Sequence, residues 1–371
     1  MTPAVAAVQR PTDAKLLVVG PDGDLRSRPR ARLADVLRAG DLVIANDAAT
    51  LPASLSGVHQ RTGATIEVRL AGRPSLSETD LGRFSAVVFG PGDFHTPTER
   101  RPLPPPMAIG DALTLGPLRA AVTGLLSHPR LISLCFDGSA DEIWAGIARH
   151  GRPIQYSHLT APLALWDVWT VIAGPPVAFE PPSAGFVIDW RTVADLRQRE
   201  IGFATITHAA GISSTGDDEL DARLPLDEPY RIPAATATAI ERARLTERRI
   251  VAIGTTVVRA LEHAAAGTGT VVAGEGLATQ HISEQTQLQV VNAILTGVHE
   301  TGTSHFRLLR AFAEESTLIR ALQTMEALGF RSHEFGDSML IERAPVLPGR
   351  RWKGSVKRIE VPVQERPDAI P

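Results

Sequence analysis

The stretch ERRIVAIGTTVVRALE at residues 247–262 decides the fold class of this chain of 371 residues. Its apolar run RIVAIG (249–254) predicts a buried strand, and VVRALEHAA (257–265) has the apolar spacing of a helix. The short sequence Gly-Thr-Thr (254–256) joins them, so the predicted strand passes almost directly into the predicted helix. A strand followed at once by a helix is the basic unit of an α/β protein.

Predicted strands and helices also occur on both sides of this unit. LLVVG (16–20) and DLVIAN (41–46) predict strands near the start of the chain, separated by the helical spacing of LADVLRAGD (33–41). FATITH (203–208) and SMLIER (338–343) predict two further core strands. A strand is also predicted at 288–298, and helices near 140–151, 190–199, 234–246, 303–313 and 316–327.

Between these parts the pattern changes. Short apolar runs such as TIEVRLAG, FSAVVFG and RLISLCFDG follow one another from about 57 to 138, with glycine and proline between them. Such a series predicts a small barrel or sandwich rather than alternating strands and helices. We therefore predict an α/β domain split by a small all-β, barrel-like domain. The predicted segments are 1–56 and 153–345 for the α/β domain, 57–152 for the insertion and 346–371 for a C-terminal extension.

Composition excludes several classes of protein. The chain has 38 lysine and arginine residues against 41 aspartate and glutamate residues, and its net charge of −3 indicates no overall basic field for nucleic acid. Its one cysteine, Cys135, rules out an internal disulfide and any metal site built from several cysteines. No apolar run reaches the ~18 residues of a membrane span, and the N-terminus lacks a secretory pattern. We therefore expect a cytoplasmic protein with no membrane segment.

Familiar ligand motifs are absent. GTGTVV (267–272) begins like a dinucleotide loop, but Val272 stands where the third glycine is needed, and no phosphate-binding GxxxxGK[ST] motif occurs. His299 and His305 are six residues apart, a spacing that does not place two imidazoles on one helical face. The sequence therefore predicts no metal.

The Gly-Thr-Thr turn offers a ligand site of its own. At the start of a helix the first backbone N–H groups lack helical partners, and Thr255 and Thr256 add two hydroxyls, so an anion or polar ligand would be favoured there. Arg259 and Glu262 lie one helical turn apart. The same residues also fit a capped helix with an internal ion pair and no ligand.

Other polar residues follow the ends of predicted strands. His208, His299 and the pair Asn46-Asp47 each stand where a strand of an open α/β sheet ends, which is the edge where ligand crevices form. A histidine there is a candidate for proton transfer near pH 7. Each has a purely structural alternative: a hydrogen-bonded scaffold histidine, a turn-forming Asn-Asp pair, and for Asp337 a solvated turn carboxylate.

Several segments together resemble the S-adenosylmethionine:tRNA ribosyltransferase-isomerases of the queuosine pathway. The resemblance covers most of 15–342, in the family's order and with similar spacing. The matching stretches are GDLVIANDAATLPASL (40–55), RTGATIEVRL (61–70), GRPIQY (151–156), PPSAG (181–185), ERRIVAIGTTVVRALE (247–262), LQVVNAILTGVHETGTSHFRLLRAFA (288–313) and FGDSMLI (335–341).

The resemblance implies an α/β domain interrupted by a small β-barrel, the same division that the chain pattern predicts. It also implies a reaction in which S-adenosylmethionine is the substrate that donates its ribosyl group to a 7-deazaguanine base in tRNA. The sugar rearranges, and adenine and methionine leave. Such an enzyme needs a base for the C5′ proton that the sulfonium acidifies, an acid for adenine, and a pocket poor in water.

The family's polar motifs match particular residues of this chain. The resemblance implies that His208, His299 and Asp47 are candidates for catalysis, without indicating which residue is the general base. It implies substrate-binding roles for residues that match the family's Asn-Asp, Pro-Thr-Ala-Gly, Gly-Thr-Thr-x-x-Arg and Gly-Asp motifs. These residues are Asn46, Ser183, Thr255, Thr256, Arg259 and Asp337.

The sequence also departs from the family pattern. Ala49 stands where the resemblance implies an arginine, and Val187 and Leu226 stand where it implies histidines. These departures indicate a changed anion clamp and the loss of at least one proton-transfer partner. They leave open two alternatives: a divergent enzyme that uses S-adenosylmethionine or a similar nucleoside with a small-molecule acceptor, and a binding protein without catalysis.

Two arginine-rich stretches are candidates for contact with tRNA. RSRPRAR (26–32) has four arginines in seven residues, and GRRWKGSVKR (349–358) places five cationic side chains around Trp352. Such patches release counterions when they meet a phosphate backbone, although most charged stretches are solvated surface. The sequence does not indicate an oligomeric state.

Overall fold

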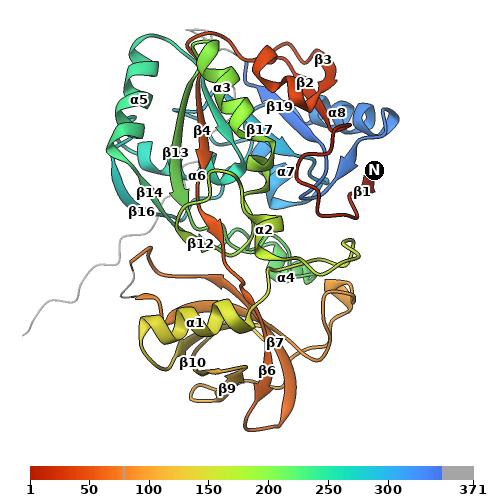
Figure 1. The fold of residues 1–371 in the computed structure, drawn as a ribbon, viewed down its shortest axis with the longest axis vertical. Helices are drawn as coiled ribbons and strands as arrows, with labels where there is room; N and C mark the ends of the chain where they lie inside the picture. The colour runs from red at the N-terminus through yellow and green to blue at the C-terminus, as the bar shows by residue number, and fades with distance from the viewer. Residues whose placement is uncertain (78–79, 345–371) are drawn as a thin grey trace, which may run out of the picture.

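The computed structural model describes residues 1–77 and 80–344, which form a nine-stranded mixed sheet and a closed six-stranded barrel (Figure 1). The predicted combination of an α/β domain and an all-β barrel is confirmed. In spatial order the sheet contains β16 (Gly274–Ala278), β14 (Glu228–Ile232), β13 (Gly202–His208), β4 (Leu42–Asn46), β15 (Ile250–Ile253), β17 (Ala293–Gly297), β19 (Ser338–Glu342), β2 (Lys15–Val19) and β3 (Leu25–Pro29).

The centre of the sheet is parallel and buried on both faces. β4 lies between β13 and β15, and Ile44 pairs with Ala204 on one side and Ala252 on the other. Every residue of β4 and β15 is buried, which explains why these strands are continuous apolar runs rather than alternating ones. Because β13, β4, β15 and β17 are all parallel, their carboxyl ends meet at one edge of the sheet.

Helices cover both faces of the sheet (Figure 1). One face is covered by α5 (Ala234–Leu245), α6 (Thr255–Ala265), α7 (Ser304–Leu309) and α8 (Glu315–Ala327), and the other by η1 (Arg30–Val36) and α3 (Trp190–Gln198). Successive strand residues point to opposite cores: Ile44 and Ala252 pack with the first group, Val43 and Val251 with the second. None of the helices among the described residues is long and apolar enough to cross a bilayer.

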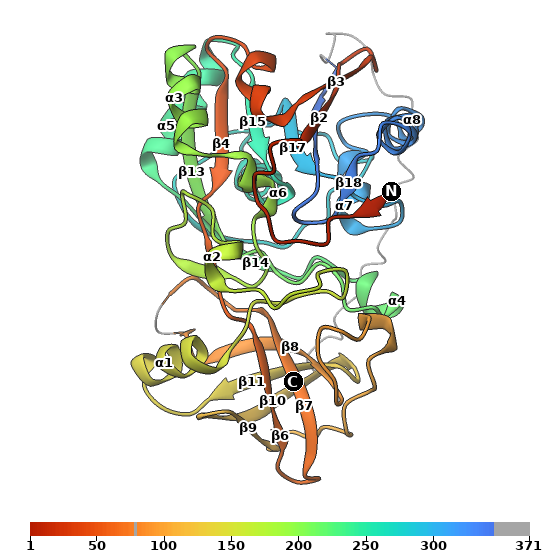
Figure 2. The same cartoon turned by 45° about the vertical axis from the view of Figure 1, so that its right-hand side comes forward.

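The barrel lies at the end of the molecule toward which β4 points (Figures 1 and 2). Its strands are β6 (Ser54–His59), β7 (Ala64–Gly72), β8 (Arg83–Phe89), β9 (Ala112–Leu115), β10 (Leu118–His128) and β11 (Leu131–Phe136). All six pairings are antiparallel, and the interior is filled by aliphatic and aromatic side chains. Helix α1 (Ala140–His150) follows the last barrel strand, begins at a capping box on Ser139, and packs against β10.

Four elements differ from the sequence prediction. The helical spacing at 33–41 forms a 3₁₀ helix that ends at Val36, before Gly40. The edge strand β16 and its neighbour β14 are not predicted, since GEGLA contains two glycines and EPYRI contains a proline. The apolar run at 288–298 becomes a strand only from Ala293, because the carboxylate of Glu262 accepts the backbone N–H groups of residues 289–291.

Candidate active site

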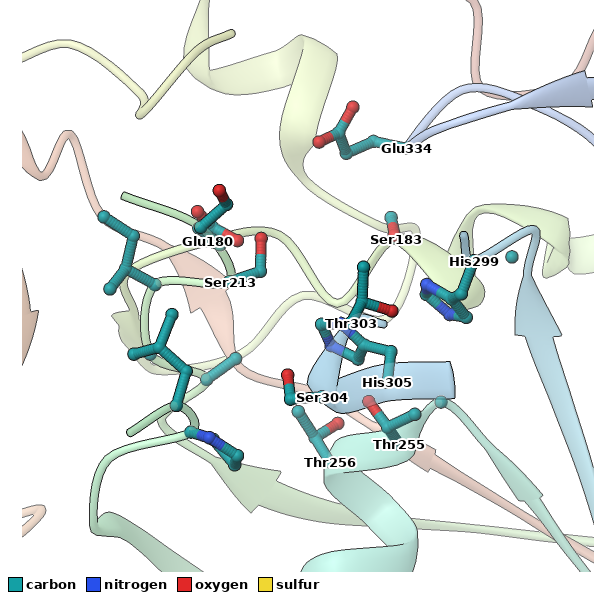
Figure 3. Close-up of a pocket in the computed structure, with 18 of the residues that line it drawn as sticks. Glu180, Ser183, Ser213, Thr255, Thr256, His299, Thr303, Ser304, His305 and Glu334 are labelled. Atoms are coloured by element: carbon teal, nitrogen blue, oxygen red, sulfur yellow. The ribbon is translucent and has the colours of Figure 1, made fainter. Parts of the chain in front are cut away.

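A cavity of about 510 Å³ lies at the carboxyl edge of the parallel strands (Figure 3). Gly254 at the end of β15 and Gly297 at the end of β17 line its wall, and Thr98 and Glu99 of the barrel domain line another part. The cavity therefore lies where the two domains meet. Its volume is within the range of cavities that hold cofactor-sized small molecules.

The start of α6 forms one side of this cavity. Gly254 has a φ of +93°, a left-handed conformation that favours glycine and turns the chain from β15 into the helix. No side chain caps the helix N-terminus, so the first N–H groups keep free hydrogen-bonding capacity. Thr255 and Thr256 line the cavity beside them, with Ser183 nearby on η4 (Ser183–Val187) (Figure 3). The predicted polar-ligand site at this turn is thus open to a cavity.

Two histidines share another wall of the cavity. The rings of His299 and His305 stack with 4.6 Å between their centroids and an angle of 12° between their planes. The Nε2 atom of His299 lies 2.7 Å from the hydroxyl oxygen of Thr296. Burial lowers the pKa of His299 well below its ordinary value and lowers that of His305 to about 4. Both imidazoles are therefore neutral at pH 7 and can accept a proton.

Glu180 faces the cavity near Ser213 (Figure 3) and is a residue that the sequence analysis missed. Its side chain is only 9% exposed, and burial raises the pKa of its carboxyl to about 7. The hydroxyl of Tyr156 is hydrogen-bonded to this carboxyl and lies 3.0 Å from the carbonyl oxygen of Ser214. A carboxyl with this pKa carries a proton in part of the molecules at pH 7 and can donate it. The available signal was a single acidic residue within the apolar stretch VAFEPP (177–182).

Arg259 does not form the internal ion pair with Glu262 that the spacing allowed. Its guanidinium pairs instead with Glu228 on β14, and both residues line the cavity. Glu262 is occupied by the three N–H groups of residues 289–291. Two side chains one helical turn apart thus have separate partners: Glu228 of β14 for Arg259, and the backbone before β17 for Glu262.

His208 lies outside the cavity lining, fully buried beneath the Glu228–Arg259 pair. Its Nε2 atom is 3.5 Å from a carboxylate oxygen of Glu228, and neither ring nitrogen has a hydrogen-bond partner. Burial, with a smaller contribution from the charge of Arg259, holds the pKa of this histidine well below its ordinary value. The structure thus does not bring His208 to the same surface as His299.

The Asn46-Asp47 pair also lies outside the cavity lining. The amide of Asn46 donates to the carbonyl of His208 at 2.9 Å and accepts from its N–H at 2.9 Å, so it fixes the end of β13. The carboxylate of Asp47 accepts hydrogen bonds from the hydroxyls of Thr205 and Thr207 at 2.8 and 2.7 Å. Both side chains join the ends of β4 and β13.

Asp337 and Val187, two further positions of the family motifs, are both buried outside the cavity. Asp337 is buried away from the cavity, where it accepts the backbone N–H groups of Lys15 and Arg331, both at 2.7 Å. Val187 is buried in the core between the sheet and α3. Of the predicted site residues, the structure gathers five on the cavity wall and leaves four outside it. The five are Ser183, Thr255, Thr256, Arg259 and His299, and the four are Asn46, Asp47, His208 and Asp337.

The arginine-rich stretch 26–32 lies near the opposite edge of the sheet, and several of its side chains have partners. Arg26 pairs with Asp24, Arg32 pairs with Asp35, and Arg30 is buried. The second stretch, 349–358, lies outside the described residues.

Comparison with known proteins shows which family the chain belongs to. A family model described as queuosine biosynthesis protein matches residues 2–341. The S-adenosylmethionine:tRNA ribosyltransferase-isomerase of Methylobacterium radiotolerans is 31% identical over 90% of this chain and 93% of its own length. That of Thermus thermophilus is 30% identical over 88% of this chain and 92% of its own. A crystal structure of S-adenosylmethionine tRNA ribosyltransferase from Thermotoga maritima has 22% identity and a TM-score of 0.48, covering 92% of this chain and 96% of that one. The chain belongs to the family of queuosine biosynthesis proteins.

Proposed function

We propose that this protein is an S-adenosylmethionine:tRNA ribosyltransferase-isomerase. It transfers the ribosyl group of S-adenosylmethionine to a 7-deazaguanine base in tRNA and releases adenine and methionine. Family membership over nearly the whole chain supports the reaction class. The observation that carries the proposal is the cavity of about 510 Å³ at the start of α6, which joins unpaired N–H groups, hydroxyls and neutral histidines in one space.

In this proposal S-adenosylmethionine occupies the cavity with a polar group at the start of α6. Thr255, Thr256 and Ser183 offer hydroxyls there, and the helix N-terminus favours an acceptor or a carboxylate. Arg259, paired with Glu228, contributes to the same wall. Asn46 and Asp337 support binding indirectly, because each fixes backbone at a strand end by hydrogen bonds.

The proton chemistry is assigned to groups that face the cavity. A sulfonium acidifies the neighbouring C5′–H, and the base is assigned to His299, whose imidazole is unprotonated at pH 7 because burial lowers its pKa. Adenine leaves more easily when it is protonated, and Glu180, with a pKa of about 7, is placed to provide that proton. Methionine departs as a neutral thioether and needs no acid.

His208 and Asp47 act on the site indirectly in this proposal. His208 supports the Glu228–Arg259 pair from below, and Asp47 ties the end of β4 to β13 through two threonine hydroxyls. Neither side chain lines the cavity, so neither touches the reacting atoms. We also infer that the protein acts in the cytoplasm, where it would meet its tRNA substrate.

The test is incubation of the purified protein with S-adenosylmethionine, with and without tRNA that carries the 7-aminomethyl-7-deazaguanine base. Mass spectrometry then follows adenine, methionine and the modified nucleoside. The proposal expects all three products only when the tRNA is present. Release of adenine without modified nucleoside, or no turnover with that tRNA, would overturn it.

A further inference from the structure

Two histidines and a glutamate that the mechanism does not use converge on the wall of the same cavity. His158 comes from the segment that follows α1, and His333 and Glu334 come from the turn between β18 (Arg331–Ser332) and β19. One potential ligand atom from each lies within 4.8 Å of the other two, and this is the metal-type cluster found among residues 1–77 and 80–344. We propose that His158, His333 and Glu334 bind a divalent transition-metal ion of the zinc type.

The donor set is the first argument for this site. Two imidazoles and one carboxylate are the three protein ligands of one class of catalytic zinc site, in which a fourth position stays open for water or substrate. Imidazole nitrogen selects ions such as Zn²⁺ over Ca²⁺ and Mg²⁺, which prefer oxygen ligands. The open position here would face the cavity, since all three residues line it.

The distances are the second argument. The Nε2 atom of His158 lies 3.0 Å from a carboxylate oxygen of Glu334, and the rings of His158 and His333 stack at 4.2 Å. Ligand atoms of a tetrahedral zinc site are roughly 3.3 Å apart, given bonds of about 2.0–2.1 Å. The pair of His158 and Glu334 already has nearly this spacing. To complete the set, His333 has to turn its ring out of the stack with His158, so that its lone pair points at the same ion.

The backbone is the third argument. His333 has a φ of +68°, a left-handed conformation that costs a non-glycine residue on the order of 1–2 kcal/mol. The N–H of Gly336 donates to the carbonyl of His333 at 2.9 Å and holds this turn. A strained residue in a cavity wall is a feature of functional sites, and here the strain falls on one of the three ligands.

The alternative is a histidine–carboxylate hydrogen bond with a second imidazole stacked on it. The experiment uses the full chain without an affinity tag, stripped with a chelator and desalted. Zn²⁺ is then titrated against a chromophoric chelator, and bound metal is counted by mass spectrometry. The expected result is one Zn²⁺ per chain, with binding at least tenfold weaker in H333A and in E334Q. His95→Ala is the matched control, because His95 also pairs with a carboxylate, Asp93, at 3.0 Å, and lies exposed outside the cavity.

Two results would overturn the inference: no retained zinc in the unaltered chain, or equal zinc affinity in the chain, H333A and E334Q. Thermal unfolding of the stripped variants shows whether they are folded, so that lost binding is not mistaken for lost structure. Co²⁺ provides a second readout, because its visible absorption bands differ between low-coordinate protein sites and the hydrated ion. The assay measures metal alone, so its outcome is independent of the proposed ribosyl transfer.

Discussion

At the residue scale, Glu180 connects burial to chemistry. The ordinary pKa of a glutamate is 4.5, and burial raises it to about 7 in the folded protein. The folded state therefore holds the proton more tightly than the unfolded state. Stability from this group is complete below about pH 4.5 and is lost as the pH rises to about 7.

Substituting Glu180 by glutamine removes this dependence, because the amide cannot ionise. We expect E180Q and the unaltered chain to have similar melting temperatures at pH 4.5, and E180Q to melt at a higher temperature at pH 8. The free energy of unfolding at pH 8 should differ by about 3 kcal/mol. The same variant lacks the acid, so adenine release should fall by about 10²-fold. Melting curves from pH 4 to 9 and a rate assay check both. Parallel pH profiles for the two proteins would contradict the raised pKa.

His299 and His208 both follow or end strands, but we expect a catalytic role for His299 and a structural role for His208. His299 lines the cavity, whereas His208 is buried below it. His299→Ala should lower adenine release by at least about a hundredfold and leave S-adenosylmethionine affinity within about tenfold, because a base acts mainly in the transition state. His208→Ala should lower the melting temperature and leave the rate per folded molecule within about tenfold. If His208→Ala lowers adenine release more than His299→Ala does, His208 rather than His299 is the general base.

The sequence predicts which residues line the cavity when their position at the end of a strand is enough to place them there. Thr255, Thr256 and His299 follow the ends of β15 and β17, and because these two strands are parallel, the residues after them lie at one edge of the sheet. The prediction fails for His208, because a strand's last residue points to one of two faces and the pattern does not show which. It fails also for the contact of His158 with Glu334, 176 residues apart, which only the folded chain brings together.

At the element scale, the junction of β15 and α6 connects fold to binding. An alanine at Gly254 would have a φ of +93°, while its Cβ would meet Ala184 and Thr256 at ordinary contact distances of 3.5 and 3.6 Å. The cost is therefore backbone strain, on the order of 1–2 kcal/mol. Relief of that strain would turn the helix N-terminus away from the cavity.

Gly267 provides the matched control for Gly254. It follows α6, has a φ of +87°, and has no atom within 4 Å of an added Cβ. We expect Gly254→Ala and Gly267→Ala to lose similar stability. Only Gly254→Ala should weaken S-adenosylmethionine binding, by at least about tenfold, since only Gly254 positions the N-terminus of α6, whose N–H groups face the ligand. Thermal unfolding and calorimetry measure the two effects. Equal affinity for S-adenosylmethionine in both variants would contradict the placement of this ligand at the start of α6.

The elements also show where sequence patterns stop being sufficient. The parallel core strands β4 and β15 are short continuous apolar runs and were predictable from the local sequence alone. The segment 288–292 contains three apolar residues, yet it is not a strand, because the carboxylate of Glu262 accepts the backbone N–H groups of residues 289–291. A buried carboxylate from another element can thus replace a strand neighbour, and no local pattern reveals this.

At the scale of the whole molecule, charge decides how tRNA could be bound. The net charge of −3 provides no general attraction for RNA, so the phosphate contacts have to be local. The stretch 26–32 is a weak candidate. Arg26, Arg28 and Arg32 line a groove with Glu342, whose carboxylate pairs with Arg249 before β15 begins. That groove lies at the opposite edge of the sheet from the cavity.

We therefore expect the stretch 349–358, which has five cationic side chains in the sequence, to supply the phosphate contacts. Affinity for tRNA should fall steeply with salt, because each neutralised phosphate releases counterions. Replacing Arg350, Arg351 and Lys353 by alanine should reduce the slope of log K against log [salt] by roughly 2–3. Replacing Arg26 and Arg28 should leave it nearly unchanged. Filter binding at several salt concentrations measures the slopes. If the slope changes only in the Arg26 and Arg28 variant, the phosphate contacts lie at the far edge of the sheet, and their assignment to 349–358 is wrong.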